Sequence, residues 1–372
     1  MRTEIVRYKE YYIFKLFNDD EKEISHAAVK ILTSRLNGAE VKSITVGGVF
    51  TDPEYRRLGA VRIIFNEINK FAEKEKCLVT FLHPFATEYY RKFGYERISN
   101  HCVLEFPMSA LEFAPRYNNL KPYKDTKSAG DLVEIYNEYA KNRNIMLERT
   151  PESYPIPEDD KKIYILYDEN DKPTAYIYYS EEYNFVINHN IGVNLNVYEM
   201  CFASLEDLIK LFGFIRMFDG NIGSVKIHDC AMSPEVELTL KHYEHMSISH
   251  YPDISARINN TQKVLSVVTY PEEKGKFIVK VTEPEKSEHS PENTAGIFKV
   301  EYQNKKSVVT KLDDNSNFDF STDIQGLTKL IYGFNTYGYE ISKYMRNTKF
   351  NNECPDFFRA FPNRPCGAYE HF

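Results

Sequence analysis

The sequence predicts a mixed α/β fold divided into three units, and two observations indicate it. Short segments with alternating apolar residues repeatedly give way to segments whose apolar residues recur every three or four positions, which are the periods of strands and helices. The chain has 372 residues, which corresponds to two or three domains at about 150 residues each. We expect the units to span residues 1–107, 108–255 and 256–372.

The first unit is predicted as a hairpin followed by a strand, a helix, a strand, a short helix and a last strand. Its strands are expected at residues 11–18, 24–36, 41–51, 78–83 and 96–106. The long helix is expected after residue 60, where the apolar residues lie on one helical face: Val61, Ile64, Phe65, Ile68 and Phe71. The short helix, at residues 85–93, ends where Gly94 provides a stop.

The second unit shows a related order of elements, which suggests a divergent internal duplication. A helix in DLVEIYNEYAKNRN precedes a hairpin in KKIYILYDENDKPTAYIYYS, and a strand then leads to a helix that begins at Ser204. The third unit has strands in GKFIVKVTE, AGIFKVEYQ and KSVVTKL, followed by an amphipathic helix in STDIQGLTKLIYGFNT. We therefore expect an α/β layer in residues 256–372.

Composition excludes several classes of protein. A formal net charge of -7 disfavours a sequence-independent nucleic-acid binder, which needs a basic excess. The chain contains no run of about eighteen apolar residues and no signal peptide, so no membrane partner is expected. Six cysteines without Cys-x-x-Cys spacing indicate reduced thiols. We expect a cytoplasmic protein without a metal site.

The segment from Val49 to Arg62 carries the chemistry. A strand leads through a basic turn that contains Gly59 into the N-terminus of the long helix. The first N–H groups of a helix have no intrahelical partner, and the helix dipole adds positive potential there, so this geometry binds pyrophosphate. Arg57 and Arg62 can add charge-assisted hydrogen bonds. Arg-x-x-Gly alone also fits an ordinary helix start, and the flanking strand and helix are what favour the phosphate site.

This segment resembles the acetyl-CoA loop of the GNAT N-acetyltransferases. Their pattern Q/R-x-x-G-x-G/A is met by Arg56 and Gly59, with Val61 in the last small position. The enhanced intracellular survival (Eis) acetyltransferases are a closer match. Their pattern V-x-x-x-P-x-[HY]-R-R-x-G is met by Val49, Pro53, Tyr55, Arg56, Arg57 and Gly59. A second shared pattern, Y-x-[RK]-F-G-Y, is met at residues 90–95, YRKFGY.

The resemblance implies the architecture and the reaction. Proteins of this kind combine a catalytic GNAT domain, a degenerate second GNAT domain, both with central mixed sheets, and a C-terminal sterol-carrier-like α/β domain, and they assemble as hexamers. We therefore expect acetyl-CoA as co-substrate and a primary amine as acceptor, of the aminoglycoside, polyamine or lysine type. The amine attacks directly in a ternary complex. Relative to this family, the first domain is expected to lack the usual first strand and two helices.

The resemblance also implies the site residues. Tyr90 protonates the leaving thiolate, and the C-terminal carboxylate, here that of Phe372, acts as the base. His83 is expected near the acceptor. The residues expected to bind acetyl-CoA are Val49, Phe50, Thr51, Arg56, Arg57, Leu58, Gly59, Ala60, Val61, Arg62, Phe85 and Ala86. The backbone of residues 49–51 can hold the pantetheine and polarise the thioester carbonyl.

Alternatives remain open at three points. Tyr89 is the alternative proton donor, and Tyr90 can instead simply pack a short helix. His83 can be an ordinary histidine at a strand end. The second unit is interpreted as structural, because Glu206 and Asp207 at its corresponding helix start repel a pyrophosphate. The rival functions are a non-catalytic acetyl-CoA-binding or scaffolding protein and a lipid carrier that acts through the third domain.

Overall fold

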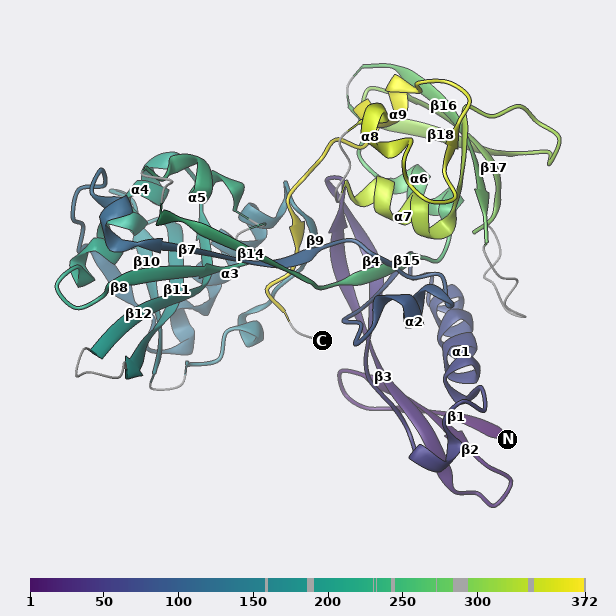
Figure 1. The fold of residues 1–372 in the computed structure, drawn as a ribbon, viewed down its shortest axis with the longest axis horizontal. Helices are drawn as coiled ribbons and strands as arrows, with labels where there is room; N and C mark the ends of the chain where they lie inside the picture. The colour runs from purple at the N-terminus through teal and green to yellow at the C-terminus, as the bar shows by residue number, and fades with distance from the viewer. Residues whose placement is uncertain are drawn as a thin grey trace. The chain divides into compact units, whose positions relative to one another are not determined.

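The computed structural model describes residues 1–157, 160–185, 191–229, 231, 233–241, 245–271, 273–283, 294–333 and 338–370 (Figure 1). The chain divides into two compact units. Unit 1 comprises Met1–Ser99, Asp253–Cys366 and, of the last three residues, the described Glu370. Unit 2 comprises Asn100–Pro252 and Gly367–Tyr369. Mixed sheets run through both units, which confirms the predicted α/β class.

The first sheet of unit 1 has the order β1-β2-β3-β4-β5-β15-β6. Its strands are β1 (Arg2–Arg7), β2 (Tyr12–Phe17), β3 (Glu23–Leu36), β4 (Ala39–Thr51), β5 (Val79–Leu82), β6 (Glu96–Arg97) and β15 (Ser255–Ile258). The pair β4–β5 is parallel, whereas every other neighbouring pair in this order is antiparallel. The helices of this part are α1 (Ala60–Lys74) and α2 (Thr87–Arg91), with a 3₁₀ turn η1 (Pro53–Tyr55).

Helix α1 forms where the apolar spacing predicted it, and that spacing explains its packing. Ile64, Phe65 and Ile68 are each at most 1% exposed and belong to one core with Phe14 and Leu16 of β2. Burying such side chains stabilises the helix by about 2 kcal/mol each relative to leaving them in water. The core therefore fixes the N-terminus of α1 against the sheet, beside the end of β4.

A strand that the sequence analysis did not predict precedes the first predicted hairpin strand. Arg2–Arg7 forms β1 and pairs with β2, from Arg2↔Phe17 to Arg7↔Tyr12. Five of its six residues are exposed, so the sequence shows no buried face and no alternation. An edge strand with charged side chains can face water in this way. Residues 8–11 join β1 directly to β2, with no helix between them.

The second sheet of unit 1 has the order β18-β17-β16-β19-β20. Its strands are β16 (Gly275–Thr282), β17 (Gly296–Gln303), β18 (Lys306–Leu312), β19 (Phe320–Asp323) and β20 (Lys349–Phe350). The remaining elements of the C-terminal part are α6 (Thr261–Val267), α7 (Ile324–Tyr332), α8 (Tyr339–Ser342), α9 (Pro355–Ala360) and the short β21 (Cys366–Gly367). The three predicted strands and the predicted amphipathic helix, α7, are thus present.

Hydrogen bonds tie this C-terminal part to the first sheet within unit 1. Asn37 donates to the backbone oxygen of Ala360 at 2.7 Å, and Gln325 donates to that of Arg91 at 3.0 Å. Arg257 of β15 is 2% exposed, pairs with Glu283 at 3.1 Å and donates to the carbonyl of Phe93. Consequently the parts that we expected as separate domains, 1–107 and 256–372, lie largely in one compact unit.

The sheet of unit 2 has the order β14-β7-β13-β12-β11-β10-β8. Its strands are β7 (Asn100–Pro107), β8 (Leu120–Pro122), β10 (Lys161–Tyr167), β11 (Pro173–Phe185), β12 (Ile191–Phe202), β13 (Ser224–His228) and β14 (Ser247–Pro252). The other elements are α3 (Ala129–Ala140), α4 (Leu205–Ile215), α5 (Pro234–Thr239), β9 (Asn144–Leu147), η2 (Met108–Leu111), η3 (Thr126–Ser128), η4 (Pro151–Ser153) and η5 (Arg216–Phe218).

The strand that we expected to close the first domain, at residues 96–106, is divided between the two units. Glu96–Arg97 stays in unit 1 as β6, whereas Asn100–Pro107 pairs with β13 and β14 in unit 2. Ser255–Ile258 takes the place between β5 and β6. An alternating segment pairs equally well in either sheet by its pattern alone, so only non-local hydrogen bonds decide where each strand lies.

Candidate functional site

Strand β4 separates from its parallel neighbour at the point where the predicted site begins. Only Ser43–Val46 pairs with β5, while β4 itself continues to Thr51. Its pairing with β3 shifts register between His26 and Ala28, opposite Gly48, which has a φ of 55°. Such a bulge bends a strand and re-aims its backbone groups. From Gly47 to Thr51, the second edge of β4 has no strand partner among the described residues.

The turn after β4 presents the N-terminus of α1 to the same space. Gly59 is the N-cap with a φ of 85°, a left-handed conformation that favours glycine. The first helical bond runs from the N–H of Ile63 to the carbonyl of Gly59, at 3.2 Å. The N–H groups of Ala60 and Val61 therefore come before the first N–H that is bonded within the helix, that of Ile63, and can serve an external acceptor.

A cavity of about 700 Å³ lies between these two features. It is lined by Val49, Phe50, Thr51, Tyr55, Arg56, Arg57, Gly59, Ala60, Val61, Arg62, Phe85, Tyr89, Lys92 and Phe93. Four of these residues are cationic and none carries a carboxylate, so the local field favours anions. The helix N-terminus adds to that field.

The short helix α2 forms the far wall of the cavity. Phe85, before the helix, is 78% exposed, whereas Tyr90 is 4% exposed and packs with Phe65 of α1. Adjacent residues on a helix point about 100° apart, so Tyr89 faces the cavity while Tyr90 faces the core. Burial raises the pKa of Tyr90 to about 12 and also raises the pKa of Tyr89. Both phenols are therefore protonated at neutral pH.

His83 follows the end of β5 and is held by a carboxylate. Its Nδ1 lies 2.9 Å from Oδ1 of Asp253, and the other oxygen of Asp253 accepts a hydrogen bond from Ser99 at 3.4 Å. Asp253 opens the segment that leads into β15, so the inserted strand determines the orientation of this histidine.

The structure gathers ten of the predicted cofactor residues around one cavity: Val49, Phe50, Thr51, Arg56, Arg57, Gly59, Ala60, Val61, Arg62 and Phe85. The other two predicted cofactor residues, Leu58 and Ala86, do not line the cavity, and Leu58 is 61% exposed. The predicted residues His83 and Tyr90 do not line it either. Phe372 lies outside the described residues.

Sequence reasoning missed Lys92 and Phe93 as lining residues and used Tyr55 only as part of a motif. Lys92 stands three residues after Tyr89, and residues at that spacing share a helical face. Its Nζ lies 5.3 Å from the centroid of the Tyr89 ring. This spacing is the signal that would have added Lys92 to the predicted cation set.

Unit 2 has a cavity of about 670 Å³ beside the start of α4, with different chemistry. Its lining includes four carboxylates, from Glu134, Glu138, Asp168 and Glu235, and only two cations, Arg143 and Lys172. The side chain of Ser204 already caps the helix by accepting the N–H of Asp207, at 3.1 Å. A pyrophosphate is therefore disfavoured at this helix N-terminus.

Two other kinds of feature are not found among the residues that the structure describes. No group of three or more His, Cys, Asp or Glu side chains is placed to hold a metal ion within that part of the chain. Of the helices described, none combines the length and apolar character required to cross a membrane.

Comparison with known proteins identifies the first part of the chain. Residues 3–98 match the family of the acetyltransferase (GNAT) domain. No curated protein sequence was found to match the chain.

Several solved structures share the fold of the chain. A GCN5-related N-acetyltransferase from Anabaena variabilis is 20% identical, with a TM-score of 0.81, covering 97% of this chain and 89% of that one. A probable N-acyltransferase from Enterococcus faecalis is 18% identical, with a TM-score of 0.77, covering 98% and 90%. Eis1 from Mycobacterium abscessus is 15% identical, with a TM-score of 0.75, covering 99% and 91%.

The match over residues 3–98 contains the split of β4 from β5, the basic turn and most of the cavity wall. The chain thus carries a GNAT acetyltransferase domain, and the predicted enzyme class, an acyltransferase, is confirmed. The solved structures add that nearly the whole chain, including unit 2, has a fold in common with them.

Proposed function

We propose that the protein is an acetyl-CoA-dependent N-acetyltransferase that modifies a primary amine of the aminoglycoside, polyamine or lysine type. One observation carries the proposal. The edge of β4 that has no strand partner among the described residues, a turn with three arginines nearby and the N-terminus of α1 converge on one cavity whose lining residues carry no carboxylate. Acetyl-CoA has the matching chemistry, because it joins an amide-containing pantetheine arm to a pyrophosphate and a further phosphate.

The donor is held by backbone groups, by cationic side chains and by apolar side chains. The backbone of residues 49–51 pairs with the pantetheine amides as an added strand, and one N–H polarises the thioester carbonyl. The pyrophosphate accepts hydrogen bonds from the N–H groups at the start of α1. Arg57 and Arg62, together with Lys92, add charge-assisted contacts. Phe85 covers the far side of the arm, and Leu58 and Ala86 flank it.

The reaction forms a C–N bond and breaks a C–S bond. The ammonium group of the acceptor first gives up a proton, its nitrogen attacks the acetyl carbon, and the thiolate of CoA leaves with a proton. Tyr90 is the proposed proton donor, and Tyr89, which lines the cavity, is the alternative. A protonated phenol can donate to a thiolate whose ordinary pKa is about 8.5. His83 is proposed to lie near the acceptor.

The α-carboxylate of Phe372 is the proposed base that accepts the proton of the ammonium group. Two variants test this role: deletion of Phe372, and addition of two glycines after it. Both alter the position of the carboxylate and leave the cavity residues unchanged. We expect each to lower kcat and to leave the affinity for acetyl-CoA unaffected. Full turnover in both variants would rule out the carboxylate as base.

The same proposal extends to the rest of the chain. Residues 108–255 are a degenerate second GNAT domain with a structural role, and residues 256–372 form a sterol-carrier-like domain. The fold shared with Eis1 of Mycobacterium abscessus over 99% of the chain supports this organisation. We also propose a cytoplasmic homo-oligomer, a hexamer by resemblance, which light scattering of the purified protein tests.

The experiment that tests the activity is release of free CoA thiol, measured with the untagged protein, acetyl-CoA and a panel of polyamines and aminoglycosides. Acetylated amine detected by mass spectrometry in equal amount to the thiol supports transfer. Thiol release without an acetylated amine indicates hydrolysis, and binding of acetyl-CoA without either product indicates a non-catalytic binding protein.

A further inference from the structure

The helix that carries both candidate proton donors is short. α2 spans five residues, Thr87–Arg91. Helices below about 12 residues are marginal in water by themselves, so contacts from other elements decide where this helix lies. Tyr89 lines the cavity, and Tyr90 packs against Phe65 of α1. The contacts that fix α2 therefore also fix the two phenols.

The C-terminal end of α2 is closed by a Schellman motif. The N–H of Tyr95 bonds the carbonyl of Tyr90 at 3.3 Å, and the N–H of Gly94 bonds that of Arg91 at 3.0 Å. Gly94 has a φ of 85°, the left-handed conformation that this motif favours. The ring centroids of Tyr95 and Tyr90 lie 6.4 Å apart, and an apolar contact of this kind often accompanies the motif. The orientation of Tyr90 is therefore coupled to the turn that follows the helix.

Two side chains from elsewhere in unit 1 bind backbone carbonyls at this end of the helix. Arg257 of β15 donates to the carbonyl of Phe93, and Gln325 of α7 donates to that of Arg91 at 3.0 Å. These two side chains are 2% and 3% exposed, so water competes little for the carbonyls. The guanidinium also lies where a cation interacts favourably with the helix dipole.

Arg257 is itself held from two directions. It pairs with Glu283, whose side chain is 9% exposed, at 3.1 Å. A Cβ added at Gly94 would lie 2.3 Å from Nη1 of Arg257, so the guanidinium lies directly against the backbone of the turn. Strand β15 pairs with β5, and β5 pairs with β4, which forms the opposite wall of the cavity. Arg257 therefore ties α2 to the sheet that carries the other wall.

We propose that Arg257 and Gln325 are positioning residues that clamp the C-terminal end of α2 and thereby hold the phenol of the proton donor at the sulfur of the leaving thiolate. This inference rests on the proposed N-acetyltransferase function. Neither residue lines the cavity, so each acts only through α2. Misplacement of a reacting group by about 1 Å can reduce turnover about a hundredfold. The part of unit 1 that contains β15 and α7 is then required for proton transfer.

Amide hydrogen exchange of the free protein tests the clamp without measuring activity. Gln325→Met removes the amide donor, has a similar volume and leaves no buried charge. The matched control is Gln262→Met, which removes a hydrogen bond of the same kind from α6 to the carbonyl of Val309, 3.2 Å long. We expect exchange in residues 87–95 to become about tenfold faster in Gln325→Met alone, with unchanged rates in α1. Wild-type rates in residues 87–95 would overturn the proposal.

A kinetic cycle tests the link to the phenol. Gln325→Met should lower kcat about tenfold, with an unchanged dissociation constant for acetyl-CoA, because most of the proposed donor contacts come from β4 and α1. Residues that act through one group are not additive. Gln325→Met should therefore cause no further loss in Tyr90→Phe, or in Tyr89→Phe if that substitution is the one that removes the donor. An equal further loss in that background contradicts the positioning role.

Arg257→Lys is the second variant of the clamp. Lysine keeps the positive charge beside Glu283, but it lacks the planar fork that lets one side chain bind this carboxylate and the carbonyl of Phe93 from separate nitrogens. We expect the same pattern as for Gln325→Met: faster exchange in residues 87–95, a lower kcat and an unchanged affinity for acetyl-CoA. If circular dichroism shows that Arg257→Lys does not fold, Gln325→Met decides the proposal.

The two arms separate failure of this inference from failure of the proposed function. If the wild type transfers no acetyl group, the proposed function is wrong and the positioning role falls with it, while the exchange rates still decide whether the clamp holds α2. If the wild type transfers the acetyl group and Gln325→Met keeps full turnover, only the positioning role is wrong.

Discussion

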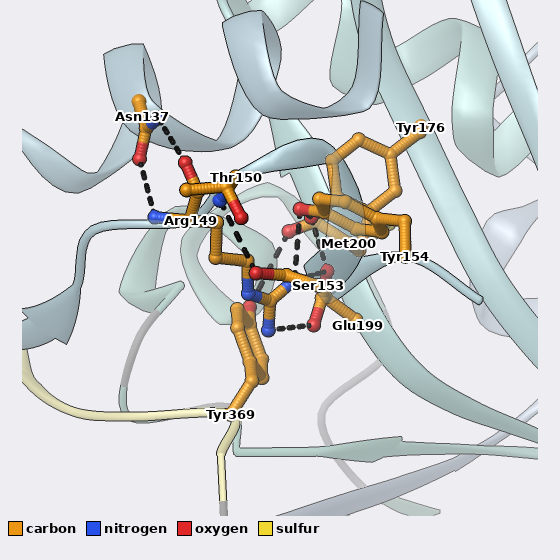
Figure 2. A network of polar contacts seen from close by, with 9 residues as sticks. All are labelled: Asn137, Arg149, Thr150, Ser153, Tyr154, Tyr176, Glu199, Met200 and Tyr369. Atoms are coloured by element: carbon orange, nitrogen blue, oxygen red, sulfur yellow. Dashed lines mark hydrogen bonds and ion pairs between the residues drawn. The ribbon is translucent and has the colours of Figure 1, made fainter. Parts of the chain in front are cut away.

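The guanidinium of Arg149 and the carboxylate of Glu199 form two parallel hydrogen bonds, 2.7 and 2.8 Å long, in the interior of unit 2 (Figure 2). Both side chains are less than one-tenth exposed. The hydroxyl of Tyr176 also donates to Glu199. Such a pair contributes little net stability compared with apolar residues, but removal of one partner leaves a buried charge without compensation.

We therefore predict that Glu199→Gln lowers the free energy of unfolding by about 3–5 kcal/mol. Urea denaturation followed by far-UV circular dichroism measures the change. The matched control is Glu301→Gln, because the pair of Glu301 with Lys299 is solvent-exposed and its loss should cost less than about 1 kcal/mol. Equal effects of the two substitutions would contradict this prediction.

Gly94 and Gly59 have the same left-handed φ of 85° but different surroundings, so alanine at the two positions should differ in cost. A Cβ at Gly94 would lie 2.3 Å from Nη1 of the buried Arg257, whereas at Gly59 nothing lies within 4 Å. We expect Gly59→Ala to lower stability by about 1–2 kcal/mol through backbone strain. Gly94→Ala should lose about 1–3 kcal/mol more through the clash. Thermal and urea unfolding measure both values.

Arg57→Ala should weaken the binding of acetyl-CoA about tenfold to a hundredfold, because a charge-assisted contact to phosphate is lost. Isothermal titration calorimetry should also give one site per chain, since the counterpart cavity of unit 2 carries four carboxylates. Arg346→Ala, at an exposed position outside the cavity, is the control. Two equivalent sites, or unchanged affinity in Arg57→Ala, would count against the assigned donor site.

Phenylalanine at positions 89 and 90 distinguishes the two candidate proton donors. Removal of the donor hydroxyl should lower kcat about a hundredfold, since general acid catalysis contributes on this scale, while the affinity for acetyl-CoA changes little. We expect this result for Tyr90→Phe and a small effect for Tyr89→Phe. The reverse order would assign the role to Tyr89, which the structure places in the cavity wall.

The buried phenol also predicts a pH dependence. Burial raises the pKa of Tyr90 to about 12, above the value of about 10 for an unfolded tyrosine. The fold thus favours the protonated form, and this contribution to stability is present below pH 10 and is lost as the pH rises through 12. A donor with this pKa stays protonated during assay, so kcat should not fall between pH 8 and about 10.5. A loss of kcat with a midpoint near 10, absent in Tyr90→Phe, would show a donor that titrates like an exposed phenol.

Local pattern was sufficient to predict the elements and most of the residues that line the cavity beside β4 and α1. The spacing of Ile64, Phe65 and Ile68 predicted α1, and the run from Val49 to Arg62 placed a strand, a basic turn and a helix N-terminus in succession. These features are contiguous in sequence, so their geometry follows from backbone connectivity and periodicity. For the same reason, ten residues predicted to bind one ligand do line one cavity.

Elements without a buried face were harder to predict. Strand β1 shows no alternation, because it is an edge strand exposed to solvent. Lys92, at the C-cap of a helix of five residues, was missed because its spacing of three residues from Tyr89 was the one local signal of the face it shares.

What the sequence by itself determined was the mixed α/β class, the order of its elements and the basic turn with its helix. Only the tertiary structure decided which strands share a sheet: Asn100–Pro107 joins unit 2, while Ser255–Ile258 enters unit 1 between β5 and β6. It also decided that Tyr89 and Tyr90 face different surroundings, that Asp253 orients His83 and that Tyr369 is held beside Met200. The physical reason is common to all of these. Each depends on hydrogen bonds and packing between residues far apart in the chain, and these long-range partners leave no periodic signal in the sequence.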